Sequence, residues 1–251
     1  MTAGGSSGLI MFAGDPHGDF GAIEAACLRF MPNVLVLLGD LTPPVELSEA
    51  LSFALDRGVG VFWIPGNHDA DDAETFERTF GSSLAPCNIS GRVIEALGVR
   101  IAGLGGKFHK KVWLPPNPPK FLNRECFLLE AGEGLRPFSL VTIFNEDIQS
   151  LKSQHSDILV SHVAPSTHPH GFTVLDDLAS SMGARLIVHA HHHRARYLAC
   201  LKGGTLVLGV GSGVALLDRA RSALLPFLAN GQGDAVWLKF SLSASFSPIH
   251  P

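Results

Sequence analysis

Five short polar clusters in this chain combine carboxylate, amide and imidazole side chains. Each cluster comes directly after an apolar run or close to the end of one, and the clusters span residues 15–19, 39–40, 66–69, 161–165 and 189–193. A hydrolytic site with two metal ions requires oxygen and imidazole ligands, one bridging carboxylate, and open positions for water and phosphate. The clusters supply this set, and the candidate metal ligands are Asp15, His17, Asp40, Asn67, His162, His191 and His193.

The spacing within the clusters indicates how these ligands are divided. Asp15 and His17 are separated by one residue, so both side chains can leave a strand end in the same direction and hold one ion. His191 and His193 have the same spacing, and in an extended turn they reach different ions of the pair. Asp40 follows a neighbouring strand, which makes it the natural bridge, and the glycine before it lets the backbone pass close to the ions.

Strands that alternate with helices are expected to position the clusters. Apolar runs at residues 9–13, 34–38 and 59–64 predict strands, and the amphipathic stretches at 20–30 and 47–55 predict helices between them. The nearly continuous apolar character of the runs is typical of strands buried on both faces of a parallel sheet. Because ligands bind at the carboxyl ends of such strands, clusters that are far apart in sequence are predicted to converge.

The pattern changes in the second part of the chain. Two alternating runs predict an antiparallel hairpin, and a cationic, proline-rich segment at about residues 105–124 predicts a long loop. The βα pattern then returns, with a helix at about residues 174–182 that is introduced by Thr173 and Asp176. The remaining predicted strands cover residues 93–97 and 99–104 (the hairpin), 158–161 and 185–189, and, as short antiparallel strands, 197–201, 205–210 and 235–242.

Length and composition limit the classes of protein to which the chain can belong. Its 251 residues, 46% of them apolar, predict a single domain over residues 1–251. A formal net charge of −4 offers no broad attraction to large nucleic acids or to an anionic membrane. The N-terminal stretch has no basic region, and its apolar run is too short for a signal peptide or a membrane span. The four cysteines are widely spaced, and we interpret them as free and mostly buried thiols. Together with the N-terminal stretch, they predict a cytoplasmic protein.

The order of the clusters resembles that of the calcineurin-like metallophosphoesterase superfamily. The family pattern is DxH, GD, GNH[DE], H and GHxH, and the similarity runs from Asp15 to His193. The resemblance implies an α/β fold in which two sheets form a sandwich flanked by helices (αββα). It implies a first ion held by Asp15, His17, Asp40 and His193, and a second ion held by Asp40, Asn67, His162 and His191.

The resemblance also implies which residues act on the substrate. His68 is then not a ligand but faces the phosphate, where it stabilises charge or protonates the leaving oxygen. The candidate catalytic residues are His68 and Asp69, and either Asp69 or Asp71 is the partner that orients the imidazole.

Two departures from the family pattern bear on function. Ala190 stands where the family usually has glycine, and we expect an adjusted turn without loss of metal. The residues after Asp40 are Leu41, Thr42 and Pro43, without the GDxxDRG continuation of the serine/threonine protein phosphatases. The resemblance therefore points to the phosphodiesterase-like branches of the family.

The function predicted on this basis is that of a dinuclear-metal-dependent phosphoesterase, more specifically a phosphodiesterase. A hydroxide that bridges the two ions is expected to attack phosphorus directly. Mixed oxygen and nitrogen ligation suits manganese, iron, nickel or zinc without choosing among them. The expected substrate is a small, nucleotide-like phosphate ester. The alternatives are a phosphomonoesterase, a nuclease for short oligonucleotides and, from another class, a non-catalytic interaction module on the same fold.

Each cluster, taken singly, also has an explanation without metal. The segment 15–19 consists of turn-forming residues, and a lone histidine such as His162 is often only a hydrogen-bonded structural residue. The histidine run at 189–193 is also compatible with a solvated tract. The joint occurrence of the clusters at strand ends favours metal binding, with His189 and His192 as supporting or surface residues.

The loop at residues 105–124 has two interpretations. In the first, it caps the metal site, where Lys110 or Lys111 meets phosphate and Phe108 or Trp113 stacks on a planar group. In the second, it is a solvated surface loop without a role in binding. The sequence does not decide between them.

Overall fold

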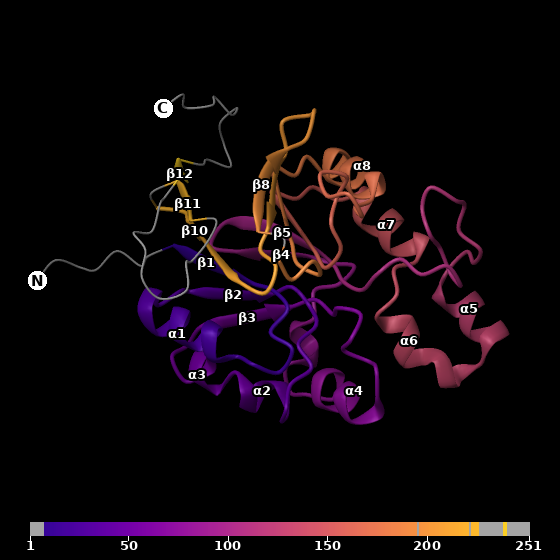
Figure 1. Cartoon of the computed structure of the whole chain (residues 1–251), viewed down its shortest axis with the longest axis horizontal. Coiled ribbons are helices and arrows are strands. Elements are labelled where there is room, and N and C mark those ends of the chain that lie inside the picture. Colours follow the sequence, from indigo (N-terminus) through magenta and orange to yellow (C-terminus); the bar gives the residue numbers. More distant parts are fainter. Residues whose placement is uncertain (1–7, 195, 221, 226–237, 240–251) are drawn as a thin grey trace, which may run out of the picture.

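Two six-stranded sheets pack face to face, and helices cover the outer side of each sheet (Figure 1). The computed structural model describes residues 8–194, 196–220, 222–225 and 238–239. The αββα sandwich predicted from the resemblance is therefore confirmed. None of the helices in these described ranges is long and apolar enough to cross a membrane.

The first sheet contains the three parallel strands predicted from the start of the chain. β1, β2 and β3 are parallel neighbours, and β10 pairs with β1 in the antiparallel direction. The sequence pattern does not indicate β10 and β11, and most of the strand expected at residues 235–242 lies outside the described residues. In sheet order the strands are β12 (Leu238–Lys239), β11 (Ala223–Leu225), β10 (Val214–Asp218), β1 (Leu9–Ala13), β2 (Val34–Leu37) and β3 (Gly60–Trp63).

The helices of the first half cover the outer face of this sheet. Their apolar side chains pack against the outward-facing residues of the strands, such as Met11, Leu35 and Trp63. The predicted helix over residues 47–55 is divided into two short helices. The helices here are α1 (Gly21–Phe30), α2 (Leu47–Ala50), α3 (Ser52–Leu55), α4 (Ala73–Phe80) and the 3-10 helix η1 (Ala85–Cys87).

The second sheet begins with the predicted hairpin. Leu97 and Gly98 form its turn, both with positive φ angles, of 55° and 69°. The expectation of purely antiparallel strands near the end of the chain is wrong for β9, which is parallel to β7. The chain reverses before β8 and again after it, so β9 regains the direction of β7. The order is β4 (Val93–Ala96), β5 (Val99–Leu104), β6 (Ile158–Ser161), β7 (Leu186–His189), β9 (Leu206–Gly209) and β8 (Tyr197–Cys200).

Helices α7 and α8 pack against each other on the outer side of the second sheet. With the neighbouring loops they form the third apolar cluster of the fold, besides the one on the outer face of the first sheet and the one between the two sheets. α8 is the predicted helix, but its expected capping by Thr173 is wrong: Phe172 is the N-cap, and Asp176 accepts hydrogen bonds from Ser166. The helices in this half are α5 (Arg124–Ala131), η2 (Glu133–Leu135), α6 (Arg136–Leu140), α7 (Asn145–Lys152) and α8 (Thr173–Met182).

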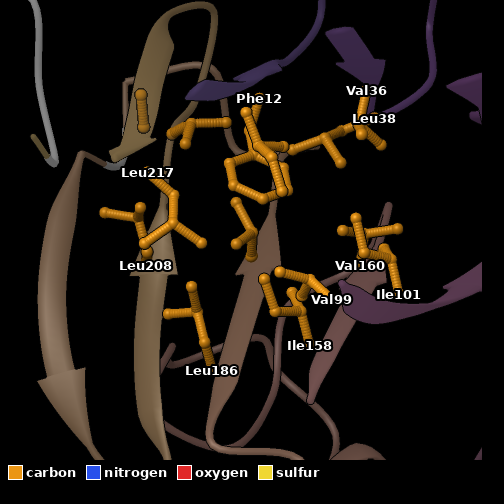
Figure 2. Packing of buried hydrophobic residues seen from close by; sticks show 14 of the residues in the cluster. Phe12, Val36, Leu38, Val99, Ile101, Ile158, Val160, Leu186, Leu208 and Leu217 are labelled. Carbon is orange, nitrogen blue, oxygen red and sulfur yellow. The ribbon is translucent and has the colours of Figure 1, made fainter. Parts of the chain in front are cut away.

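The central core lies between the two sheets and holds the strand ends in place. Alternate residues of each strand point into it, so Phe12 and Val36 from the first sheet meet Val160 and Leu208 from the second (Figure 2). β1 and β2 are buried on both faces, as their continuous apolar runs predict, whereas Gly60 and Phe62 of β3 are only partly buried. Of the four cysteines, which are all free, only Cys27 is buried, so the expectation of mostly buried thiols is wrong.

Candidate metal centre

The five polar clusters meet where the two sheets bring their strand ends together. Asp15, Asp40 and Asn67 follow the neighbouring strands β1, β2 and β3, whereas His162 follows β6 and the histidine run follows β7. Contacts between side chains join the two halves of the sandwich, because His162 from the second sheet lies within 3.4 Å of Asp40 from the first. The convergence predicted from the sequence is thus observed.

Two glycines make this close approach of loops possible. A Cβ atom on Gly39 would lie 2.4 Å from the backbone nitrogen of Gly66, and a Cβ on Gly66 would lie 2.2 Å from that of Asp40. Any other residue would push the Asp40 and Asn67 loops apart. The predicted reason for Gly39, a close passage of the backbone, therefore applies to Gly66 as well.

Four of the seven candidate ligands have a left-handed backbone conformation. The φ angles are 44° for Asp15, 44° for His17, 51° for Asp40 and 65° for His191. This conformation costs a residue other than glycine on the order of 1–3 kcal/mol, and such strain is typical of functional sites. Each of these residues lies in a turn that follows a buried strand, namely β1, β2 or β7.

One ligand group consists of His17, Asp40 and His193. The Nε2 atoms of His17 and His193 are 3.0 Å apart. The Nε2 atom of His17 lies 3.7 Å from Oδ2 of Asp40. Ligand atoms that share one ion at bond lengths of about 2.0–2.2 Å lie roughly 3–3.5 Å apart, so these three atoms are close to a coordinating arrangement.

The second ligand group consists of Asp40, His162 and His191 and therefore shares Asp40 with the first. The Nε2 atom of His162 lies 3.4 Å from Oδ2 of Asp40 and 3.1 Å from Nδ1 of His191. Oδ1 of Asn67 is 3.3 Å from the same Nε2 atom, which adds the predicted amide ligand. His191 and His193 belong to different groups, as their spacing predicts.

Two unpaired carboxylate oxygens indicate that the groups are suited to cations. Oδ2 of Asp15 and Oδ2 of Asp40 are buried and have no hydrogen-bond partner. The second oxygen of each carboxylate is occupied, because Asp15 Oδ1 accepts from the N–H of His191 and Asp40 Oδ1 accepts from the N–H of His68. A buried anionic oxygen without a partner is costly unless a cation balances it. The residues therefore fit two divalent ions.

The protonation states of the ligands depend on one another. Burial raises the pKa of Asp15 to about 7, although the charge of His162 opposes this shift. Burial would also raise the pKa of Asp40, but the imidazole of His162, whose Nε2 atom lies 3.4 Å from Oδ2, outweighs burial and holds that pKa below its usual range. In return, Asp40 raises the pKa of His162 to about 9 against the effect of burial. An ion that binds to His162 must displace this stabilised proton, so binding releases protons.

His68 stands beside the ligands with a carboxylate partner of its own. Its ring lies 5.6 Å from that of His17, and its Nδ1 atom is 2.5 Å from Oδ2 of Asp71. Asp69 does not contact the ring: its carboxylate accepts from the N–H groups of Leu41, Thr42 and Gly66. Of the two predicted orienting partners, Asp71 therefore has this geometry, and the catalytic assignment of Asp69 is corrected to a structural one.

The buried carboxylate of Asp69 joins the Asp40 and Asn67 loops, so we expect Asp69→Ala to destabilise the fold. The substitution leaves three backbone N–H groups without an acceptor and should lower the free energy of unfolding by about 3 kcal/mol or more. Chemical denaturation of chelator-treated protein measures this without the contribution of bound metal. As a matched control, Asp72→Ala removes an exposed N-cap of α4 and should cost only about 1 kcal/mol. Equal losses in the two variants would contradict the role of Asp69.

Phe108 and Trp113 of the loop at residues 105–124 are not free for the stacking that the first interpretation requires. Phe108 and Trp113 are only 5% and 7% exposed, and Trp113 donates its Nε1–H to the carbonyl of Asn117. The two rings contact each other and anchor the loop in the core of the second half. Lys111 lies over the ring of Phe138, and Arg124 pairs with acidic residues of α7, so both have structural contacts.

The charge of one lysine of this loop, Lys107, contributes to the pKa of the candidate ligand His191. Burial lowers the pKa of His191 to about 3, and the charges of His162 and, more weakly, Lys107 act in the same direction. The backbone of Lys107 is fixed by hydrogen bonds with Val141 and Ile143. Sequence spacing does not single out Lys107 among the cations of the loop, because its position depends on this pairing with a distant segment.

Ala190 is accommodated without displacement of the neighbouring ligand. Its side chain is buried in the core between the sheets, opposite Gly14. A Cβ atom on Gly14 would lie 2.7 Å from that of Ala190. The glycine after β1 thus provides the space for the methyl group, and His191 keeps its place in the second ligand group.

Comparisons with known proteins agree with this geometry. The sequence model of a family described as calcineurin-like phosphoesterase matches residues 8–195. A protein of Haemophilus influenzae described as uncharacterized is 37% identical over 195 residues, which are 74% of this chain and 83% of that protein. The structure of TT1561 from Thermus thermophilus has a TM-score of 0.55 at 17% identity and covers 87% of this chain and 97% of its own. GAP50, the anchor in the inner membrane complex of Plasmodium, has a TM-score of 0.50 at 10% identity and covers 94% of this chain and 89% of its own. At these identities, the two solved structures show the fold alone.

Proposed function

The chain belongs to the calcineurin-like phosphoesterase family, and we propose that its substrates are phosphodiesters. As a member of this family it is a metal-dependent phosphoric ester hydrolase with two divalent ions. The observation that carries the proposal is the pair of ligand groups that share Asp40, whose buried Oδ2 atom accepts no hydrogen bond and lies between His162 and His17, at 3.4 and 3.7 Å. When bound, the two ions lower the pKa of a water molecule and neutralise phosphoryl oxygens.

We assign the roles of the residues as follows. Asp15, His17, Asp40 and His193 hold one ion, and Asp40, Asn67, His162 and His191 hold the other. His68, oriented by Asp71, stabilises charge on the phosphoryl group or donates a proton to the leaving oxygen. Water attacks phosphorus directly, without a covalent enzyme intermediate.

The surroundings of Asp40 favour a diester over a monoester. A monoester carries more negative charge and benefits from a further cation, such as the arginine of the protein phosphatases. Here Leu41 is buried, and Thr42 donates its N–H to Asp69, so this segment supplies no cation. The experiment is a comparison of kcat/KM for bis(p-nitrophenyl) phosphate and p-nitrophenyl phosphate. We expect a clear preference for the diester, and the opposite preference would identify a phosphomonoesterase.

Metal content tests the number of ions directly. Seven candidate ligands are too many for one tetrahedral site, so we expect close to two transition-metal ions per fully loaded chain. Element analysis after growth with manganese, iron, nickel or zinc measures the stoichiometry and shows which of these metals the site retains. A value that stays at zero with every metal would contradict the site and support the alternative of a non-catalytic interaction module.

We also propose a cytoplasmic location, because all four cysteines are free and such thiols persist in reducing compartments. The nuclease alternative is restricted to short oligonucleotides by the net charge of −4. A panel of dinucleotides and longer single strands separates it from a phosphodiesterase for small esters.

A further inference from the structure

Two stacked imidazoles stand beside the metal centre without belonging to either ligand group. The rings of His168 and His192 have their centroids 3.6 Å apart and their planes 15° apart. The ring of His192 lies 5.0 Å from that of His191, so the stack begins at the edge of the proposed centre. Both histidines are partly exposed.

The loop that carries His168, between β6 and α8, is held in shape by its own contacts. The N–H of His168 donates to the carbonyl of Pro165, and the N–H of Gly171 donates to the carbonyl of His168. Pro165 and Phe172 form a β-bridge that closes the loop. Phe172 packs in turn on the buried ring of Phe108. His168 is therefore positioned before any ligand arrives.

A hydrogen-bonded chain connects this loop to the strands on which the metal-binding histidines depend. The hydroxyl of Tyr197 on β8 lies 2.8 Å from Nε2 of His189 and 3.0 Å from Oγ1 of Thr167. His189 is buried at the end of β7, as expected for a supporting residue. The chain thus fixes the His168 loop relative to the histidine run that includes His192.

The chemistry of the stack suits an uncharged planar group. Burial lowers the pKa of His168, which favours the uncharged form of this ring. Its Nδ1 atom accepts from the N–H of His170, which leaves its proton on Nε2 as a donor. Parallel rings do not direct their nitrogens at one point, and this pair is not among the metal-binding groups found in the described part of the chain. A flat aromatic face with one donor matches a heteroaromatic ring better than a phosphoryl oxygen or an ion.

We propose that His168 and His192 form the subsite for the ester group of the substrate and select groups that contain a planar heteroaromatic ring of the nucleobase class. This inference rests on the proposed function, because the metal centre must hold the phosphate for the ester group to reach the stack.

The test compares ligands that differ only in the planar ring. AMP and ribose 5-phosphate share the phosphate and the sugar, and inorganic phosphate reports on the metal centre alone. With the manganese-loaded protein, calorimetry should show AMP binding about 10-fold more tightly than ribose 5-phosphate. His168→Ala should reduce this ratio to nearly one, with unchanged metal content and affinity for inorganic phosphate. His168→Phe should retain most of the ratio because a phenyl ring also stacks.

His155→Ala is the matched control, since His155 is exposed next to the opposite end of β6 and should leave the ratio unchanged. Equal affinities for AMP and ribose 5-phosphate in the unaltered protein would overturn the proposal. A loss of affinity for inorganic phosphate in His168→Ala, in parallel with the loss for AMP, would also overturn it. The same holds if the unaltered protein binds a third metal ion per chain and His168→Ala does not. A loaded protein that binds none of the three ligands overturns the proposed function itself, and the inference with it.

Discussion

Replacement of Asp40 by asparagine is expected to remove both metal ions and to lower kcat on the order of 10³-fold or more. Asp40 is the one residue present in both ligand groups, and its Oδ2 atom lies 3.4 Å from His162 and 3.7 Å from His17. Asparagine retains Oδ1, so the hydrogen bond from the N–H of His68 is preserved. It replaces Oδ2 by an NH₂ group, which cannot bridge two cations.

The measurement for Asp40→Asn is element analysis together with turnover of a diester. Asp19→Asn is a suitable control, because Asp19 belongs to the same cluster as Asp15 and is exposed. Within the described part of the chain, its carboxylate accepts a hydrogen bond from the N–H of Gly21 alone. The control should keep two ions and normal turnover. An Asp40→Asn protein that retains both ions would show that another residue bridges them. A loss of ions together with a loss of folded structure would also count against the bridging role, and circular dichroism distinguishes this case.

The strands and the convergence of the ligands could be predicted because both are encoded locally. An apolar run such as residues 34–38 is buried on both faces, and the polar residue that ends it must lie at the sheet edge. The division of His191 and His193 between two ligand groups agrees with the expectation of an extended turn, although the spacing alone does not distinguish this pair from Asp15 and His17. The single-domain organisation over residues 1–251 stays a prediction.

The parts that could not be predicted depend on partners that are distant in sequence. Asp69 appears catalytic in the motif, but three N–H groups from two loops occupy its carboxylate. Phe108 and Trp113 are in a proline-rich loop and nevertheless pack into the third apolar cluster. Their burial depends on α5 and α7, which the sequence pattern does not indicate. Lys107 and the stack of His168 and His192 are visible only once the loops are placed in space.

Replacement of His68 by alanine is expected to separate chemistry from metal binding. No ligand group includes His68, so the variant should retain two ions per chain. Its kcat should fall on the order of 10²-fold or more through loss of a general acid or charge stabiliser. Asp71→Asn should have a smaller effect in the same direction, because the carboxylate 2.5 Å from Nδ1 orients and polarises the ring but does not touch substrate. A His68→Ala protein that loses metal would show that the roles are wrongly assigned.

The dependence on the leaving group then decides between the two roles of His68. p-Nitrophenolate is stable without a proton, whereas an alkoxide leaving group requires one, so a general acid matters much more for alkyl esters. If His68 donates a proton, His68→Ala should depress hydrolysis of methyl or nucleoside diesters far more than that of bis(p-nitrophenyl) phosphate. If it stabilises charge on the phosphoryl group, both substrates should lose the same factor. Single-turnover rates at equal metal content give the factor by which His68→Ala slows each substrate, and the ratio of these two factors is the quantity to compare. Because Asp71 acts through the ring of His68, Asp71→Asn must change this ratio in the same direction.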